Sequence, residues 1–386
     1  MLALPRTVLP TATREVAALP AGAPGHAWSH PAAGLRVLGF GEAERREGSD
    51  LRAVLAGLSG GAWLGSARFS GSWPGFGAVR FVRPRVLGFS EGGRHFLTAA
   101  TPRELDEALR AAPALHAVQP LARRVADPAA RRRWNALVGE ALQEIDAGRL
   151  QKVVVARAID VEASGAIGPH ALLATLEEQN PESRGFLVRG DGGEAFVGAT
   201  PETLCRVEDG LVHTEALAGS GVDPAALLES GKDLREHRWV VGHVVEALSR
   251  VAGPVQRRAR PGVRTLPHLS HLHTPMKARL LPGRGVADVA AALFPTPAVN
   301  GVPLNAALKF LADHEGLERG LYAGLVGWVA DGRAELSVAL RCALLSGHRA
   351  RLFVGAGIVA GSSAASEWDE TELKAQALLT ALGVRA

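Results

Sequence analysis

Two acids and one lysine recur at helical spacing near the end of the chain. Glu367, Glu370 and Lys374 are three and then four residues apart, so they share one face of the helix that we expect from about residue 364 to residue 382. An exposed Glu–Lys pair there would stabilise the helix by roughly 0.3 kcal/mol and do no chemistry. The glycine-rich stretch 355–361 favours a second interpretation, because glycine lets a ligand approach the backbone closely.

Two more charged residues, one acid and one base, stand in apolar surroundings. Glu236 lies beside the apolar stripe of a long helix expected from about residue 223 to residue 251. With a carboxylate from another helix it would suit Mg2+, which binds one or two carboxylates plus water and substrate oxygens; paired with an arginine, it would be structural. Lys152 opens the β-branched run 152–157, which predicts a strand. Its amine either extends to water or is buried with a lowered pKa.

A further acid and an arginine complete the set of candidate groups. Glu202 follows a Thr-Pro pair, a pattern that by itself indicates no more than the start of a turn. Arg341 stands between aliphatic Leu340 and Cys342 on an expected strand. A buried guanidinium needs an anionic partner, which is either an internal acid or the carboxylate of a substrate.

Lysine is rare in this chain. Only five of the 43 basic residues are lysines, and Lys152 and Lys374 are two of them. Arginine cannot lose its proton near neutral pH, whereas a buried lysine can. The bias therefore draws attention to the positions where a lysine is kept.

These residues are distributed over a chain that mixes strands and helices without strict alternation. Short apolar runs separated by glycine and proline predict antiparallel strands, and a proline-rich loop is expected between residues 252 and 285. We therefore predict an α+β fold in which helices cover antiparallel sheets. The expected helices are 128–148, 168–178, 223–251, 286–293, 304–315 and 364–382, and the expected strands are 36–40, 62–69, 78–82, 85–89, 152–157, 185–188, 194–198, 204–207, 323–329, 335–343 and 351–358.

The composition excludes several classes of protein. The 386 residues are 47% hydrophobic and 21% charged, which rules out a disordered or disulfide-stapled chain. The two cysteines, Cys205 and Cys342, are too few for a CxxC-type metal site. No apolar run reaches the ~20 residues of a membrane-spanning helix, and the net charge of +4 is too dilute for a nucleic-acid binder. We expect a cytoplasmic protein that contacts neither nucleic acid nor membrane.

Nine short blocks occur in the order in which the chorismate-utilising enzymes carry them, and on these blocks the chain resembles that family and, within it, the isochorismate synthases. The resemblance covers about residues 130–384, whereas residues 1–120 match only in general character. It implies one chorismate-binding domain over residues 1–386. The blocks are Lys-Val-Val-Val-Ala-Arg (152–157), Phe-Val-Gly-Ala-Thr-Pro-Glu (196–202), Leu-Ala-Gly-Ser (217–220), Lys-Asp-Leu-Arg-Glu-His (232–237), His-Leu (271–272), Pro-Thr-Pro-Ala-Val-Asn-Gly-Val-Pro (295–303), Glu-Arg-Gly-Leu-Tyr-Ala-Gly (318–324), Gly-Ala-Gly-Ile-Val (355–359) and Glu-Trp-Asp-Glu-Thr-Glu-Leu-Lys (367–374).

The resemblance implies two packed antiparallel sheets with helices outside, and a Mg2+-dependent site that isomerises chorismate to isochorismate for menaquinone or siderophore synthesis. By matching position, Lys152 is expected to be the base that activates water for attack at ring carbon C2. Glu202 is expected to be the acid that protonates the departing C4 hydroxyl. Glu236 and Glu370 are expected to bind Mg2+, with Glu367 nearby.

The resemblance also assigns contacts to the two carboxylates of the substrate. The backbone N–H groups of Gly219 and Ser220 are expected to contact the ring carboxylate, with His271 close by. The enolpyruvyl carboxylate is expected to contact a second set of groups, namely Arg341, the Gly355 backbone and Lys374.

Four positions distinguish members of the family. Lys152 favours water as the nucleophile, because anthranilate synthases use ammonia and carry Gln there. Ala218 disfavours aminodeoxychorismate synthesis, in which a nucleophilic Lys stands at that position. Ala298 favours stopping at isochorismate, because enzymes that also eliminate pyruvate carry Thr. Phe294 is more usual in the amine-using branch, so salicylate and anthranilate synthesis stay open.

The remaining alternative is a relative that binds its ligand without catalysis. We expect instead an enzyme whose substrate is chorismate and whose nucleophile is water. Such an enzyme needs no glutamine amidotransferase subunit, and we expect a monomer or a weak dimer.

Overall fold

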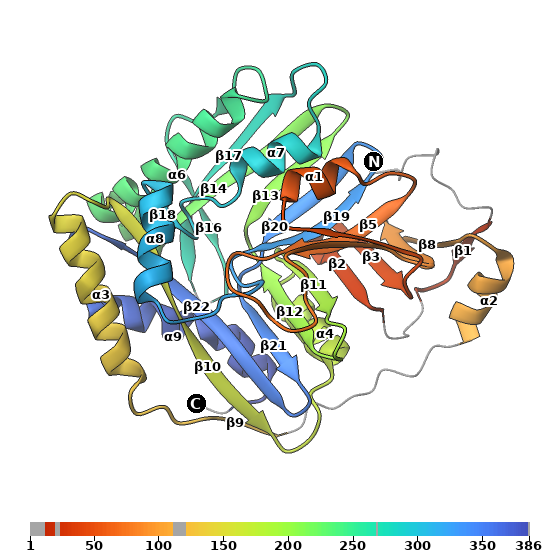
Figure 1. The fold of residues 1–386 in the computed structure, drawn as a ribbon, viewed down its shortest axis with the longest axis horizontal. Helices are drawn as coiled ribbons and strands as arrows, with labels where there is room; N and C mark the ends of the chain where they lie inside the picture. Colours follow the sequence, from red (N-terminus) through yellow and green to blue (C-terminus); the bar gives the residue numbers. More distant parts are fainter. Residues whose placement is uncertain (1–11, 20–23, 111–120, 268, 385–386) are drawn as a thin grey trace.

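The computed structural model describes residues 12–19, 24–110, 121–267 and 269–384. In this part of the chain two large antiparallel sheets pack against each other, and helices flank them (Figure 1). This arrangement confirms the α+β fold with two packed antiparallel sheets. None of the described helices is long and apolar enough to cross a lipid bilayer.

The larger sheet has 12 strands within the described ranges, and each strand runs antiparallel to its neighbours. In spatial order its strands are β1 (Ala12–Val16), β8 (Arg94–Ala99), β7 (Val86–Glu91), β3 (Leu35–Phe40), β2 (His26–His30), β11 (Arg184–Arg189), β12 (Ala195–Thr200), β21 (Cys342–Ser346), β22 (Arg349–Val359), β10 (Lys152–Ala163) and β18 (Gly301–Val302), with β9 (Ala122–Arg124) also paired to β10.

The smaller sheet has ten strands among the described residues and is likewise antiparallel. Its strands are, in spatial order, β15 (Gln256–Arg257), β17 (Ser270–Arg279), β14 (Leu211–Gly221), β13 (Thr203–Glu208), β20 (Arg333–Val338), β19 (Leu325–Ala330), β5 (Ala62–Ala67), β6 (Val79–Arg83) and β4 (Glu44–Gly48), and β16 (Gly262–Thr265) pairs with β17.

Apolar side chains from both sheets and from the helices share continuous buried clusters. Phe186 and Phe353 of the larger sheet lie in one cluster with Leu204 and Leu325 of the smaller sheet, so the main core is between the sheets. Helices α6 and α7 pack on the smaller sheet, and α3, α4, α8 and α9 pack on the larger one. The helices are α1 (Leu51–Ala56), α2 (Pro102–Arg110), α3 (Ala130–Asp146), α4 (Pro169–Gln179), α5 (Pro224–Glu229), α6 (Gly231–Ser249), α7 (Val286–Leu293), α8 (Leu304–His314) and α9 (Ala364–Ala381).

Strands from the first hundred residues lie inside both sheets. β2 pairs with β11 in the larger sheet, and β5 pairs with β19 in the smaller one. The N-terminal strands therefore share their hydrogen bonds with the part of the chain that carries the nine blocks. This pairing supports one domain over residues 1–386, which stays a prediction.

The helix predicted over residues 223–251 is two helices, α5 and α6. The break is at Ser230, whose ψ of 106° is not helical and whose hydroxyl accepts a hydrogen bond from the N–H of Asp233. A serine that bonds the first turn in this way starts a new helix. The prediction was wrong there because the apolar spacing continues across the break.

The strand predicted over residues 335–343 is also two elements. β20 ends at Val338 in the smaller sheet, and β21 begins at Cys342 in the larger one. Between them Arg341 has a φ of 49°, the left-handed region that turns the chain sharply. Arg341 is therefore on a connection between the sheets and not on a strand.

The predicted proline-rich loop contains β17, a long strand at the centre of three pairings. It pairs with β14, β15 and β16. From Leu272 to Ala278 its side chains alternate between buried and less buried positions, with Leu272, Thr274, Met276 and Ala278 inside. This alternation with period two was the signal for a strand, and the histidines and Pro275 concealed it.

A buried guanidinium replaces a missing strand neighbour at the edge of β10. Beyond residues 152–153, which pair with β18, Arg319 donates to the carbonyls of Val154 (2.6 Å) and Val299 (2.9 Å). Glu315 accepts from the Ala156 N–H at 2.8 Å and pairs with Arg319 at 2.6 Å. Arg319 has no exposed surface, so the pair holds this edge without water.

We expect Arg319→Met to lower the free energy of unfolding by about 3 to 5 kcal/mol, because it leaves the buried Glu315 charge unpaired. The matched control is Lys309→Met, which breaks the Lys309–Asp313 pair on α8. These two residues are also four positions apart, but the lysine side chain is 79% exposed and the aspartate side chain 48% exposed. Urea unfolding measures both variants. A loss for Lys309→Met as large as that for Arg319→Met would contradict this account of the β10 edge.

Candidate active site

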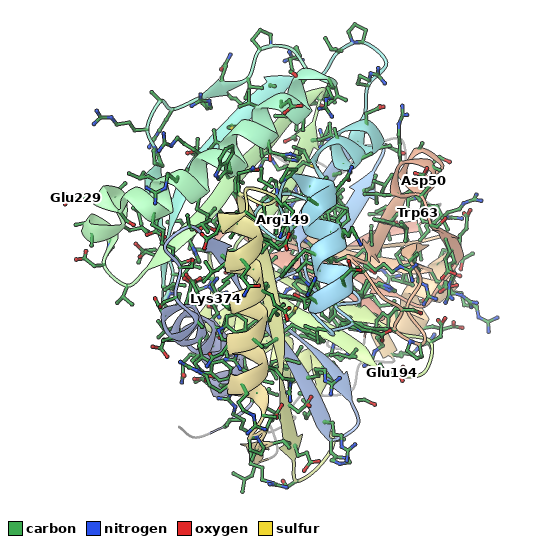
Figure 2. The ribbon with its side chains drawn as sticks, turned by 60° about the vertical axis from the view of Figure 1, so that its left-hand side comes forward. Asp50, Trp63, Arg149, Glu194, Glu229 and Lys374 are labelled. Carbon is green, nitrogen blue, oxygen red and sulfur yellow. The ribbon has the colours of Figure 1, made fainter. Side chains whose placement is uncertain are left out.

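A cavity of about 700 Å³, including its open mouth, lies where the two sheets meet. Strands β10 and β22 of the larger sheet, β14 and β17 of the smaller sheet, and helices α6 and α9 contribute to its wall. Eleven of the 13 predicted site residues line it, namely Glu202, Ala218, Gly219, Ser220, Glu236, His271, Ala298, Arg341, Gly355, Glu370 and Lys374. Lys374, labelled in Figure 2, comes from α9. The other two predicted residues, Lys152 and Glu367, lie behind this wall.

The amine of Lys152 is buried against a carboxylate of the cavity wall. Lys152 is 0% exposed, and its Nζ lies 2.9 Å from Oε1 of Glu236 on α6. The lysine therefore does not extend to water. Gly357 on β22 leaves room for the pair, because a Cβ there would lie 2.5 Å from that oxygen and 3.2 Å from Cε of Lys152.

Lysines determine the charge of Glu236. Burial opposes ionisation, but Lys152, and more weakly Lys374 and Lys232, hold the pKa of Glu236 below its usual value. Glu236 is therefore an anion at neutral pH. It faces the cavity with a negative charge that a cation can share.

Unlike Glu236, the carboxyl of Glu202 is uncharged at neutral pH. Glu202 is 4% exposed in the connection between β12 and β13, and burial raises its pKa to about 8, with a further contribution from Glu215. Its backbone N–H bonds the Thr200 hydroxyl, which in turn donates to the Val338 carbonyl. At neutral pH the group is a carboxylic acid at the cavity wall, able to donate a proton.

Three acids of α6 and α9 form the second part of the site. Glu236 and Glu370 line the cavity, and Glu367 is 1% exposed behind them. Burial and the nearby Glu370 charge raise the pKa of Glu367, although Lys232 contacts it at 2.5 Å. Glu370 pairs with Lys374 at 2.5 Å, so the pair expected on this helix exists, but it lies at the cavity.

Two cationic side chains, Arg341 and Lys374, lie close together in the cavity wall, next to the neutral His271. Arg341 lies 3.3 Å from Nε2 of His271 and donates to the Lys374 carbonyl at 3.1 Å, and Lys374 donates to the Gly355 carbonyl at 2.9 Å. Burial, Arg341 and Lys374 hold the pKa of His271 well below its usual value. Because a guanidinium only donates, Nε2 accepts and Nδ1 carries the proton towards Ser220 Oγ, 3.0 Å away.

A β-bulge shapes the backbone at Gly219. Ala218 pairs with Leu272 and Ser220 with His271, so Gly219 is left out of the ladder between β14 and β17. Its φ of 79° suits glycine. Gly219 and Ser220 both line the cavity at this bulge, and their contacts with a substrate carboxylate stay a prediction.

Several residues of the site had no assigned role before the structure. Tyr322 and Phe353 line the cavity with their rings stacked at 5.4 Å. His237 has its Nδ1 3.2 Å from the Ala218 carbonyl and its Nε2 2.8 Å from Thr274 Oγ1. Tyr322 and His237 stand within two of the nine blocks, which was the only signal for them.

Comparisons with known proteins show which proteins this chain is similar to. The family model for the chorismate binding enzymes matches residues 56–383. The chain is 36% identical over 337 residues to the salicylate biosynthesis isochorismate synthase of Pseudomonas aeruginosa, covering 80% of this chain and 70% of that protein. It is 36% identical over 247 residues to the isochorismate synthase EntC of Escherichia coli, covering 61% of this chain and 63% of that protein.

A solved structure shares the arrangement of both sheets. The menaquinone-specific isochorismate synthase MenF of Escherichia coli superposes with a TM-score of 0.80 and 25% identity. The match covers 97% of this chain and 95% of that one. The similarity therefore includes the N-terminal strands as well as the region of the nine blocks.

The native protein should become less stable as the pH rises from about 4.5 to about 8, and we expect Glu202→Gln to remove this part of the pH dependence. The carboxyl keeps its proton up to about pH 8 in the folded protein and only to about pH 4.5 when unfolded, so between these values the folded state binds the extra proton. The free energy of unfolding of the native protein therefore falls as pH rises through this window, by up to about 1.4 kcal/mol per pH unit from this group. Urea unfolding from about pH 5 to about pH 8 measures it.

The matched control for this measurement is Glu178→Gln on α4, where the side chain is exposed. Water surrounds that carboxylate in both states, so the pH slope of the native protein should be kept. Identical slopes for the native protein and Glu202→Gln would contradict the charge state assigned to Glu202.

Proposed function

The chain belongs to the chorismate binding enzyme family, and on that premise we propose that it is a Mg2+-dependent isochorismate synthase. It converts chorismate to isochorismate by adding water at ring carbon C2 and releasing the C4 hydroxyl as water. The observation that carries this proposal is a pair of buried groups, the protonated carboxyl of Glu202 in the cavity wall and the amine of Lys152 directly behind that wall, against Glu236. A base and an acid at separate points are what this exchange requires.

The proton inventory follows from these two residues. In the proposed step the amine of Lys152 accepts a proton from water as the water oxygen bonds to C2. Glu202 gives its proton to the hydroxyl that leaves C4, and the double bonds of the ring shift between the two carbons. Transfer of a proton from Lys152 back to Glu202, through water, restores the starting state. Atoms balance, because one water enters and one leaves.

The acids of α6 and α9 fit Mg2+. No group of three or more His, Cys, Asp or Glu side chains in the described part of the chain is arranged to hold a metal by itself. Glu236 and Glu370 nevertheless face one cavity, and Mg2+ characteristically binds one or two carboxylates and completes its shell with water and substrate oxygens. When bound, the ion would neutralise the ring carboxylate. Glu367, held by Lys232, would orient Glu370 from behind.

The cations at the other side of the cavity match the second substrate carboxylate. Arg341 keeps its charge at neutral pH, since burial lowers its pKa only to about 10. Lys374 lies beside it, and the neighbouring His271 is neutral and adds no charge. A dianionic substrate is thereby bound in one orientation, with its two carboxylates towards different groups.

Water as the nucleophile has consequences for partners. Because ammonia is not consumed, no glutamine amidotransferase subunit is needed, and the protein acts as a monomer or weak dimer in this proposal. Its product serves menaquinone or siderophore synthesis. Salicylate synthesis is the second candidate, and pyruvate release distinguishes it.

Incubation with chorismate and Mg2+ tests the function. We expect isochorismate as the product, at a rate that ammonium does not change, with no pyruvate released. Lys152→Met, which keeps the volume but removes the base, is expected to lower kcat at least about 100-fold. Lys277→Ala, at an exposed position of β17, is the control and should keep native turnover.

Each other product identifies another member of the family. Pyruvate with salicylate would establish the salicylate synthase, and an ammonium-dependent aminated product would establish the amine-using branch. No Mg2+-dependent turnover at all would leave the non-catalytic relative. Native turnover by Lys152→Met would refute the assignment of the base.

We also expect Gly357→Ala to impair the same step through geometry. The added Cβ would displace the Glu236 carboxylate and press on Lys152, so kcat should fall and more Mg2+ should be needed for half-maximal rate. Gly242→Ala, on the same helix as Glu236 but with nothing within 4 Å of the added Cβ, is the control. Equal kinetics for the two variants would contradict the role given to the space beside Gly357.

A further inference from the structure

A largely buried ion pair lies beside Glu202, outside the residues predicted for the site. Glu215 on β14 and Arg264 on β16 make two parallel contacts, at 3.0 Å from Nη1 to Oε1 and 2.6 Å from Nη2 to Oε2. The side chains are 8% and 22% exposed. His273 on β17 adds a third contact, at 2.8 Å from its Nε2 to Oε2 of Glu215. Such bidentate contacts are geometrically specific.

The same two side chains hold the backbone on both sides of Glu202. Arg264 donates to the carbonyl of Pro201 at 2.8 Å, and Glu215 accepts from the N–H of Thr203 at 2.9 Å. The ion pair therefore fixes the backbone at Pro201 and at Thr203, the two neighbours of Glu202 in the chain. The carboxyl of Glu202 points from this fixed segment into the cavity wall.

The pair also contributes two charges of opposite sign. For Glu202, burial is the largest influence, Glu215 adds to it, and Lys152, Arg264 and Lys374 oppose it. Burial disfavours the charge of Glu215 too, but His273 and Arg264 outweigh it and hold its pKa at about 2. The remaining acid nearby, Glu335 on β20, is paired with Arg184 at 3.1 Å.

We propose that Glu215 and Arg264 form a clamp that positions the carboxyl of Glu202 and controls whether it is protonated. They are positioning residues, because they act through Glu202 and lie outside the cavity lining. The inference rests on the proposed function in that Glu202 is taken as the proton donor. Glu215 favours the protonated donor, and Arg264 limits how strongly it does so.

Replacing one member of the clamp at a time gives opposite effects. Glu215→Gln removes the negative charge and leaves Arg264 positive, so Glu202 should lose its proton at lower pH. Arg264→Gln leaves Glu215 negative, so Glu202 should keep its proton to higher pH. We expect shifts of about 1 pH unit in each direction, the size that a single neighbouring charge produces. A role that was only structural would not give shifts of opposite sign.

The titration is measured without substrate, by the infrared carbonyl stretch of the protonated carboxyl. The band of Glu202 is identified by its absence in Glu202→Gln, and its midpoint is followed with pH in the full-length protein. The matched control is Glu335→Gln, which breaks the pair between Glu335 on β20 and Arg184 on β11 and leaves the Arg264–Pro201 and Glu215–Thr203 contacts in place. It should leave the Glu202 midpoint in place even if it lowers stability.

The double variant Glu215→Gln, Arg264→Gln separates charge from geometry. With both charges removed, the titration midpoint of Glu202 should return towards the native value. The kcat of this double variant should still be lower than that of the native protein, because the backbone of residues 201–203 is no longer held. The single variants should move the alkaline limb of kcat in the same directions as the infrared midpoints. If Glu215→Gln does not fold, the proposal is tested by Arg264→Gln alone, in which the titration midpoint of Glu202 should move to higher pH.

Shifts in opposite directions support the clamp, whereas unchanged midpoints, or shifts of the same sign, overturn it. The two proposals fail separately in this design. If the midpoints shift as expected but the native protein makes no isochorismate, the proposed function is overturned and the control of Glu202 by the clamp is supported. If the native protein makes isochorismate and the midpoints do not move, the clamp is overturned.

Discussion

Burial of charged side chains at the junction of the two sheets is the constraint on which the site depends. A buried carboxyl with no dominant cation beside it keeps its proton, and one with a close cation loses it. Burial raises the pKa of Glu202, whereas the buried Glu236 is ionised because Lys152 contacts it. One cavity thus presents a neutral carboxylic acid and a carboxylate anion built from the same residue type.

Two of the passages of the chain between the sheets each bring a charged residue to the cavity. Glu202 is on the passage from β12 to β13, and Arg341 is on the passage from β20 to β21. The two crossings bond each other, since the Val338 N–H donates to the Glu202 carbonyl and the Ala199 N–H donates to the Arg341 carbonyl. The positions of Glu202 and Arg341 are therefore coupled through the backbone.

Local patterns in the sequence predicted most elements and the candidate groups, and failed where distant segments decide. The spacing that predicts α9 also places Glu367 and Glu370 on one helix face. The break at Ser230 and the crossing at Arg341 depend on capping and on sheet pairing, which apolar spacing does not report. The clamp residues Glu215 and Arg264 meet across 49 residues, so no local pattern relates them.

Buried cationic side chains in the described ranges are of two kinds, arginine and lysine, which differ in whether they can lose their proton. Lys152 is the one fully buried lysine in the described ranges, whereas Arg319 and Arg157, also buried, bond backbone carbonyls or side-chain oxygens of the scaffold. Arginine stays charged at any pH the protein meets, which suits a permanent support. A proton acceptor must be able to exist without its charge. In the described ranges, where the other fully buried cation is an arginine, Lys152 is the buried cation that suits the proposed exchange of a proton.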